Sequence, residues 1–372
     1  MSTQSPHRLH TIFSVITQFG YTDEILSLLK KNILGTKGKI RYRQKHIEKR
    51  LKQQSGLRFL TISVKNSLFG TIGLDSREVF SQKKSHRALY VRYLSIRNSY
   101  HSNAKETDAP SQRSPKNSLL NSLINEELNN QLEKEATNRD LPPCSYAYVE
   151  SNNLNSLNLC RRFGYVFVRK INTLFISRIR KKSSDKVHPV LPEELREFDQ
   201  HLEAFYSDHS LFYNVHSTEQ DSKYFVFKEH GKIKAGLRAR PVSWEIVELP
   251  DKFMSAVFTF SKYLPIIRKI IQPSSLEFIA IDKVWFTESY SHSLFPMIHH
   301  ALYETDHHLA FFWGDSDSEV SKIINDPKKA GVFSKIQKPV SAHLMIRNLD
   351  SDSQITNIFT HHPVYVQSPD MT

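Results

Sequence analysis

The chain has 372 residues and a net charge of +13, from 51 Lys and Arg against 38 Asp and Glu. Two cysteines are too few for a disulfide framework and no apolar run approaches a membrane span, which excludes a disulfide-stabilised secreted scaffold and an integral membrane protein. We therefore expect a soluble, cytoplasmic protein with two domains of ordinary size.

The positive charge is concentrated in the first half of the chain. Residues 1–190 contain 33 Lys and Arg against 14 Asp and Glu, a net charge of +19, whereas residues 191–372 contain 18 against 24, a net charge of −6. A basic half can attract nucleic acid, an acidic lipid or a ligand with phosphate groups. Charge alone does not choose among these partners.

The first half alternates segments of strand and helix character. Thr22, Asp23 and Glu24 form a capping sequence for a helix that Gly35 ends. Three strand-like segments follow, and then a helix with leucines at helical spacing. The predicted elements are a strand at 10–19, a helix at 22–34, strands at 57–64, 68–74 and 88–96, and a helix at 117–136.

Residues 37–52 are dense in Lys and Arg. Ile40, Ile47 and Leu51 allow an amphipathic helix with a charged outer face. That face serves either as a patch for phosphate groups or nucleic acid, or only as a solvated surface, which is the more common role of a charge run.

Residues 146–178 have the pattern of a strand, a helix and a second strand. Asn153 is suited to cap the helix, because its side-chain oxygen can accept hydrogen bonds from the free N–H groups of the first turn. An apolar stripe with three-residue spacing follows, and Gly164 ends the helix. The stripe consists of Leu154, Leu157, Cys160 and Phe163.

This unit resembles the C-terminal half of the core of GNAT (Gcn5-related) N-acetyltransferases. In that family an Asn-x-x-Ser/Ala helix leads into a Gly-Phe or Gly-Tyr pair, and the matching residues are Asn153, Ser156, Gly164 and Tyr165. The order of elements in the first half matches as well. The resemblance implies that two neighbouring parallel strands separate and admit the pantetheine arm of an acyl-CoA, which pairs as an extra strand would.

The resemblance also implies which residues contact the cofactor. The strand at 88–96 would present the backbone of Leu94, Ser95 and Ile96 to the acyl-CoA, with Asn153 and Ser156 on the facing helix. We therefore expect these five residues to bind the cofactor.

The loop that would hold the pyrophosphate departs from the family pattern. The family uses Gln/Arg-x-x-Gly-x-Gly/Ala, whereas the segment 97–116 is long and polar, and Pro115 and Asn117 fall at the two glycine positions. Either side chains hold the phosphates or the domain no longer binds CoA. The candidate side chains in the first case are Arg113, Lys116, Asn117 and Ser118.

Two residues are candidates for proton transfer. Many GNAT enzymes carry a Tyr four residues before the Gly as a general acid, and Cys160 occupies this position. A thiol can donate a proton, but a lone Cys in an apolar stripe is more commonly a core residue. Glu150, at the end of a strand, is the candidate for a base that acts through water on an incoming amine.

The second half repeats the order of elements in outline, after a linker at about 183–190. We predict an α/β fold (a mixed α+β sheet) of two GNAT-like domains in tandem, each a mixed, mostly antiparallel sheet flanked by helices. The domains span 1–183 and 191–350, and a polar C-terminal tail spans 351–372. The predicted elements are helices at 193–206, 294–303 and 317–324, a hairpin at 224–237, and strands at 276–286, 309–313 and 342–346.

The predicted function is transfer of an acyl group from an acyl-CoA, with acetyl-CoA expected, to a primary amine. The alternative is a catalytically inactive GNAT-like protein that regulates or binds, for example through nucleic acid or another anionic partner on its basic half. Histidines at 299, 300, 307 and 308 do not predict a metal site, because adjacent histidines on a helix diverge. Neither the acceptor nor the oligomeric state follows from the sequence.

Overall fold

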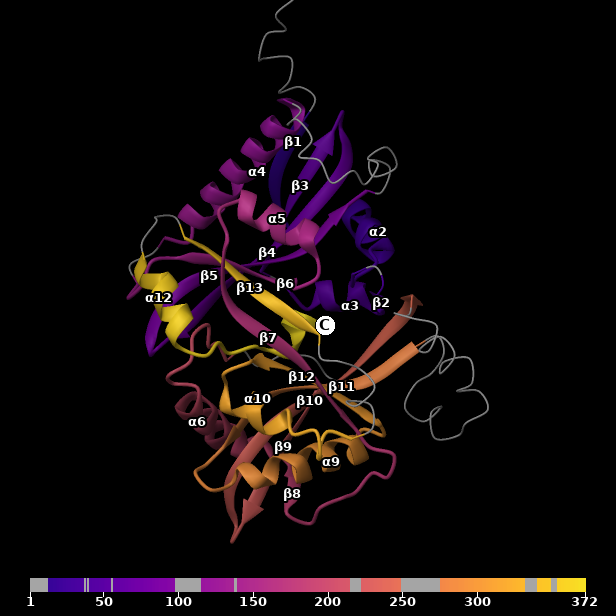
Figure 1. The fold of residues 1–372 in the computed structure, drawn as a ribbon, viewed down its shortest axis with the longest axis vertical. Helices are drawn as coiled ribbons and strands as arrows, with labels where there is room; N and C mark the ends of the chain where they lie inside the picture. The colour runs from indigo at the N-terminus through magenta and orange to yellow at the C-terminus, as the bar shows by residue number, and fades with distance from the viewer. Residues whose placement is uncertain are drawn as a thin grey trace, which may run out of the picture.

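The computed structural model describes residues 13–36, 38, 40–54, 56–97, 115–136, 139–214, 222–248, 275–331, 340–348 and 353–372. Within these ranges the chain forms one mixed sheet of 13 strands with helices packed on its faces (Figure 1). The predicted α/β class with a mixed sheet is confirmed. No helix in these ranges is both long and apolar enough to cross a membrane.

The first half follows the predicted order, and its capping side chains explain where helices begin. Thr22 Oγ1 accepts a hydrogen bond from Ile25 N at 3.3 Å, and Asn153 Oδ1 accepts one from Ser156 N at 3.1 Å. The elements are β1 (Phe13–Phe19), α2 (Asp23–Lys31), β2 (Arg41–Gln44), α3 (Ile47–Lys52), β3 (Leu57–Val64), β4 (Ser67–Ser81), β5 (Lys84–Ile96), α4 (Pro115–Glu133), β6 (Cys144–Glu150), α5 (Leu154–Arg162) and β7 (Val166–Ser177).

The second half repeats this order: a first strand and a helix, three antiparallel strands, a helix, a strand, a short helix and a last strand. Its elements are β8 (Val187–Pro189), η2 (Pro192–Glu194), α6 (Leu195–Phe205), β9 (Lys223–Glu229), β10 (Lys232–Glu248), β11 (Ser275–Phe286), η3 (Ser291–Ser293), α9 (Leu294–Glu304), β12 (Leu309–Asp315), α10 (Glu319–Ile324) and β13 (Ser341–Asn348), followed by α12 (Ser353–His361) and α13 (Ser368–Met371).

The two halves share one sheet because each places its last strand beside the other half. The sheet order is β1-β3-β4-β5-β6-β13-β7-β12-β11-β10-β9-β8. β13 lies antiparallel between β6 and β7, and β7 pairs with β12 of the second half. Figure 1 shows β13, in yellow, crossing the centre of the molecule beside β7. The region where the halves meet is therefore a continuous part of the sheet.

The cationic segment 37–52 does not form the single helix that its pattern predicts. Residues 41–44 form β2, which pairs antiparallel with β10, and only α3 is helical. Tyr42 of β2 stacks on Trp244 of β10, with ring centroids 3.8 Å apart. Ile47 and Leu51 form the buried face of α3. The aromatic contact explains why this part is a strand.

The C-terminal residues, predicted as a polar tail, are largely buried at their end. We call residues 363–372 the strap. Val364, Tyr365 and Val366 lie in the largest core cluster, and Thr372 is only 1% exposed. Ser210 holds the start of the strap, because its N–H donates to the Pro363 carbonyl and its own carbonyl accepts from Tyr365 N. The strap thus runs through the interior to the centre of the molecule (Figure 1).

Candidate functional site

Strands β5 and β6 run parallel and separate before either one ends. They pair only over residues 88–90 and 144–146, although the strands continue to Ile96 and Glu150. β6 keeps its pairing with β13, and β5 keeps its pairing with β4 as far as Ile96, so the sheet opens between β5 and β6. The strap lies at this divergence, at the centre of Figure 1.

β5 carries a bulge just after the divergence. Its register against β4 shifts between Arg92 and Ser95, so Tyr93 and Leu94 have no register partner. Tyr93 has a φ of 54°, in the left-handed region. Gly73 of β4 is needed beside it, because a Cβ there would lie 2.9 Å from the Tyr93 ring. The bulge takes backbone groups out of the ladder at the point where the strands separate.

Arg92 places a buried positive charge beside this bulge. Its guanidinium lies over the rings of Tyr90 and Tyr93, 5.2 and 4.3 Å from their centroids, and its Nη2 donates to the Pro369 carbonyl at 3.0 Å. The residue is 8% exposed, and among the described residues nothing accepts a hydrogen bond from its Nε or Nη1. Open donors on a buried guanidinium are suited to bind negative charge.

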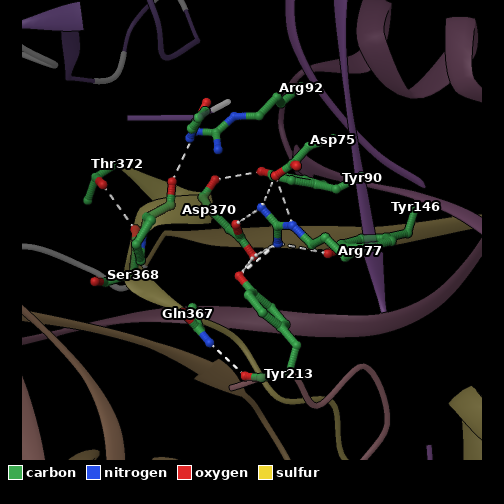
Figure 2. Close-up of polar contacts among 12 residues, drawn as sticks. Asp75, Arg77, Tyr90, Arg92, Tyr146, Tyr213, Gln367, Ser368, Asp370 and Thr372 are labelled. Atoms are coloured by element: carbon green, nitrogen blue, oxygen red, sulfur yellow. Dashed lines mark hydrogen bonds and ion pairs between the residues drawn. The ribbon is translucent and has the colours of Figure 1, made fainter. Parts of the chain in front are cut away.

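A buried cluster around Arg77 fixes the strap (Figure 2). Arg77 pairs with Asp370 of the strap at 2.8 Å and with Asp75 at 2.6 Å. Its Nη1 also donates to the hydroxyls of Tyr146 and Tyr213, at 3.0 and 2.7 Å. Burial raises the pKa of both phenols well above the ordinary value, so they act as neutral hydrogen-bond partners.

Glu150, the predicted base, lies across the divergence from β5. Burial raises the pKa of Tyr42, the charge of Glu150 raises it further, and Arg50 of α3 lowers it. Arg50 Nη2 also donates to the Pro369 carbonyl at 3.0 Å. These interactions place Glu150 in a group with Tyr42 and Arg50, next to the strap.

The backbone of Leu94, Ser95 and Ile96, which the resemblance assigns to cofactor binding, ends β5 beside α2. Asn32 Nδ2 donates to the Leu94 carbonyl at 3.5 Å. Ser95, Ile96, Asn32 and Arg97 are among the residues that line a cavity of about 630 Å³. This volume is in the range of small-molecule sites.

The other predicted residues of this half lie on α5. The Asn153 side chain caps the helix, so its oxygen is already occupied by the Ser156 N–H. Cys160 packs, half-buried, against the core that contains Leu157 and Phe163, and burial raises its pKa to about 11. The Cys160 thiol is therefore a weaker acid than an ordinary thiol, whose pKa is about 8.5.

Three of the four predicted phosphate-binding residues lie at the start of α4. Arg113 lies outside the described residues. α4 begins at Pro115, two residues before the predicted start, which places Lys116, Asn117 and Ser118 in its first turn. Proline is favourable at the first helical position. The role of these side chains in phosphate binding stays a prediction.

The second half contains the same divergence and the same bulge. β11 and β12 pair only over residues 279–281 and 310–312, and the β11 register against β10 shifts between Asp282 and Trp285. Lys283, at this bulge, has a φ of 48°. When the strand pairing of β11 and β12 is aligned on that of β5 and β6 at the bulge, Asp282 is equivalent to Arg92 and Asp315 is equivalent to Glu150. This correspondence is internal evidence that the halves are repeats.

The four histidines that the sequence analysis considered as metal ligands, His299, His300, His307 and His308, are engaged in hydrogen bonds. His299 Nε2 accepts from Arg178 Nε at 2.5 Å, and burial together with this positive charge lowers its pKa to about 4. His300 Nδ1 accepts from Ser184 N at 3.1 Å. In the described part of the chain no three His, Cys, Asp or Glu side chains are grouped to hold a metal ion.

Sequence reasoning missed the strap and the arginines that contact it. Arg77 and Arg92 look like ordinary polar residues of a strand in the sequence, and Asp370 lies in a short polar segment. One signal was available: the run Val364-Tyr365-Val366 is apolar and favours a buried, extended segment.

No protein-family model matches the chain, and no curated protein matches it. Among solved structures it is similar to Saccharomyces cerevisiae N-myristoyltransferase with bound myristoyl-CoA, with a TM-score of 0.56 and 10% identity over 90% of this chain and 82% of that chain. A second structure of the same enzyme with bound myristoyl-CoA gives a TM-score of 0.57 and 10% identity, over 94% and 83%. N-myristoyltransferase has the GNAT fold, and the chain has this fold with two GNAT-like halves in tandem, as the sequence predicts.

Proposed function

We propose that the protein is an acyl-CoA-dependent N-acyltransferase whose active site lies where β5 and β6 diverge. The observation that carries the proposal is the bulged, diverging strand pair. It leaves Tyr93 and Leu94 outside the ladder, beside the open donors of Arg92 and across from Glu150. An extended ligand that pairs as an extra strand fits this geometry. The fold it shares with an enzyme seen with bound myristoyl-CoA supports the same conclusion.

In the proposed reaction, the acceptor nitrogen attacks the thioester carbonyl, the C–N bond forms, and the C–S bond breaks to release CoA. Glu150 accepts the proton that the amine loses, directly or through water, and returns it to the departing thiolate. Arg92 and the N–H groups of the bulge stabilise the negative charge on the carbonyl oxygen. We assign no acid role to Cys160, because its raised pKa disfavours proton release.

The acyl group we propose is a short one, with acetyl-CoA as the co-substrate. The cavity at the end of β5 includes Ser95, next to the bulge, and five of the eleven residues that line it are charged. They are Asp23, Glu24, Lys31, Arg41 and Arg97. A long alkyl chain would have to displace water from these charges, which is unfavourable, whereas an acetyl group would not.

Calorimetric titration of the intact protein with acetyl-CoA and with myristoyl-CoA tests this proposal. We expect acetyl-CoA to bind, and binding to be lost in Ser156→Trp, whose ring would enter the space beside the diverging strands. Asn158→Trp, at an exposed position of the same helix, is the matched control and should bind normally. Failure of both acyl-CoAs to bind would contradict the proposal. Tighter binding of myristoyl-CoA would contradict the short acyl group alone.

A further inference from the structure

A basic cavity of about 640 Å³ lies beside α3 and β2, where the two halves meet. Its lining includes five cationic side chains and two carboxylates, which gives a formal charge of +3 with neutral histidine. These residues are Lys30, Arg43, Lys45, Lys49, Lys52, Glu48 and Glu245. Part of the cationic segment 37–52 therefore lines a cavity. A charged helix face that served only for solubility would not require a cavity.

The two carboxylates do not neutralise the cavity. The ion pairs are Glu48 with Lys30 and with Lys52, both at 3.0 Å, and Glu245 with Arg43 at 3.4 Å. The single negative charge of Glu48 is thus shared between two lysines. Lys45 donates to the neutral hydroxyl of Ser275 at 2.9 Å and forms no ion pair within the described ranges. An anionic group in the cavity would complete this charge balance.

Positive groups continue from the cavity to the candidate active site. Lys49 lines the cavity, and the next residue, Arg50, donates to the Pro369 carbonyl. The same carbonyl accepts from Arg92. Lys49 and Arg50 are consecutive residues of α3, so their side chains leave the helix about 100° apart, and their charged ends lie on the order of 10 Å apart. An extended chain of about three residues covers this distance.

We propose that the acyl acceptor carries an acidic group about 10 Å from its amine, and that the basic cavity binds this group. This inference rests on the proposed acyl transfer, since it assigns the acceptor of that reaction. Lys45 and Lys49 bind the acid, and the amine reaches Glu150 and Arg92 beside the strap.

The test compares peptide probes of equal length that differ only in charge. Gly-Ala-Glu-Glu-amide and Gly-Ala-Gln-Gln-amide are titrated into the acetyl-CoA-bound protein, and a phosphoserine peptide of the same length distinguishes phosphate from carboxylate. We expect the acidic peptides to bind at least about tenfold more tightly than the Gln peptide, equivalent to about 1.4 kcal/mol. In Lys45→Gln/Lys49→Gln this preference should disappear. Lys83→Gln/Lys84→Gln, at the exposed β4–β5 turn, removes the same charge and should preserve it.

Each outcome separates the inference from the function on which it rests. If acetyl-CoA binds but the Glu and Gln peptides bind equally, or both double variants lose the preference equally, the inference is wrong and acyl transfer is unaffected. If the acidic peptide binds but no acyl-CoA does, the proposed function fails and the assignment of an acceptor fails with it. Tighter binding of a short single-stranded oligonucleotide than of the acidic peptides would also overturn the proposal, in favour of a nucleic-acid site.

Discussion

The two halves contain the same diverging strand pair and fill it differently. In the first half, β5 and β6 separate around the strap, whose Asp370 carbonyl accepts a hydrogen bond from Tyr90 Oη at 2.6 Å. In the second half, the strap also contacts the divergence of β11 and β12, because Ser368 N donates to Asp282 Oδ2 at 2.8 Å and Val364 N donates to Asp315 Oδ2 at 3.0 Å. Aromatic side chains of α6 and its C-cap pack there as well. Phe198 packs edge-on against Trp285, and Tyr206 Oη donates to the Val284 carbonyl at 2.6 Å. Both divergences therefore contain charged residues and part of the strap, but aromatic side chains also pack into the second one.

The charged positions of the two bulges show the same difference. Arg92 faces Gly73 and keeps open donors, whereas Asp282, at the equivalent position, faces Arg238 and binds it through two hydrogen bonds of 2.6 and 2.7 Å. Burial alone would raise the pKa of Asp282, but the Arg238 charge outweighs it and the pKa is lowered. At this position the second half therefore has a paired carboxylate, and the first half has a guanidinium whose open donors can bind a ligand.

The largest effect is expected from Glu150→Gln, because it removes the proposed base. General-base catalysis contributes about 10² to 10⁴-fold, so we expect kcat to fall about 10³-fold with little change in stability. The measurement is CoA release with an amine acceptor, together with thermal unfolding.

Asp315→Asn is the matched substitution in the second half. Asp315 is fully buried and pairs with Arg169 at 2.7 Å, so its loss should lower the free energy of unfolding by about 3 kcal/mol. Equal losses of activity in the two variants, at equal stability, would contradict the different roles of Glu150 and Asp315.

Asp282→Asn breaks the closed ion pair of the second half. Arg238, which is fully buried, would lose its counter-charge, and we expect the free energy of unfolding to fall by about 3 kcal/mol in urea denaturation at neutral pH. A loss below about 1 kcal/mol would show that the second divergence is not held by this pair.

The buried His86 gives β5 a pH dependence that the equivalent position of β11 lacks. Burial lowers the pKa of His86 to about 4, against about 6.5 in the unfolded chain, and the equivalent residue in the second half is the buried Leu276. The unfolded state binds the proton first, so this contribution is complete above pH 6.5 and is lost as the pH falls toward 4. It amounts to about 3 kcal/mol.

His86→Leu, which copies the second half, should therefore weaken the fall in stability between pH 6.5 and 4. The measurement is the free energy of unfolding at several pH values for both proteins. Parallel curves for the wild type and the variant would contradict the assignment to His86.

The order of elements could be predicted from the sequence, because local signals specify it. Thr22 and Asn153 cap helices, Gly164 at φ 78° ends one, and Lys65-Asn66 makes the tight turn between β3 and β4. The repeat in the second half followed from the same kinds of signal.

The exchange of last strands and the path of the strap could not be predicted in this way. Both depend on contacts between distant segments, such as β13 with β6 and Asp370 with Arg77, which are 293 residues apart. The bulge at Tyr93 contains no glycine, so the sequence of β5 gives no signal for it. The bulge is defined only by the pairing of β5 with the neighbouring strand β4. Which candidate residues lie close together therefore depends on long-range pairing, which local sequence signals do not specify.

The smallest effect on stability is expected from Arg92→Met, and it is the sharpest comparison with Asp282→Asn. Arg92 forms no direct ion pair among the described residues, and Asp370, whose charge attracts it, already pairs with Arg77. Removing the Arg92 charge therefore relieves most of its desolvation cost, and the side chain of Met keeps most of the packing against Tyr90 and Tyr93. The lost hydrogen bond to the Pro369 carbonyl opposes this gain, so we expect the free energy of unfolding to change by less than about 1 kcal/mol. Acyl transfer should nevertheless decrease in the same samples. A stability loss as large as that of Asp282→Asn would mean that Arg92 holds the fold together, and that the first divergence is closed in the same way as the second.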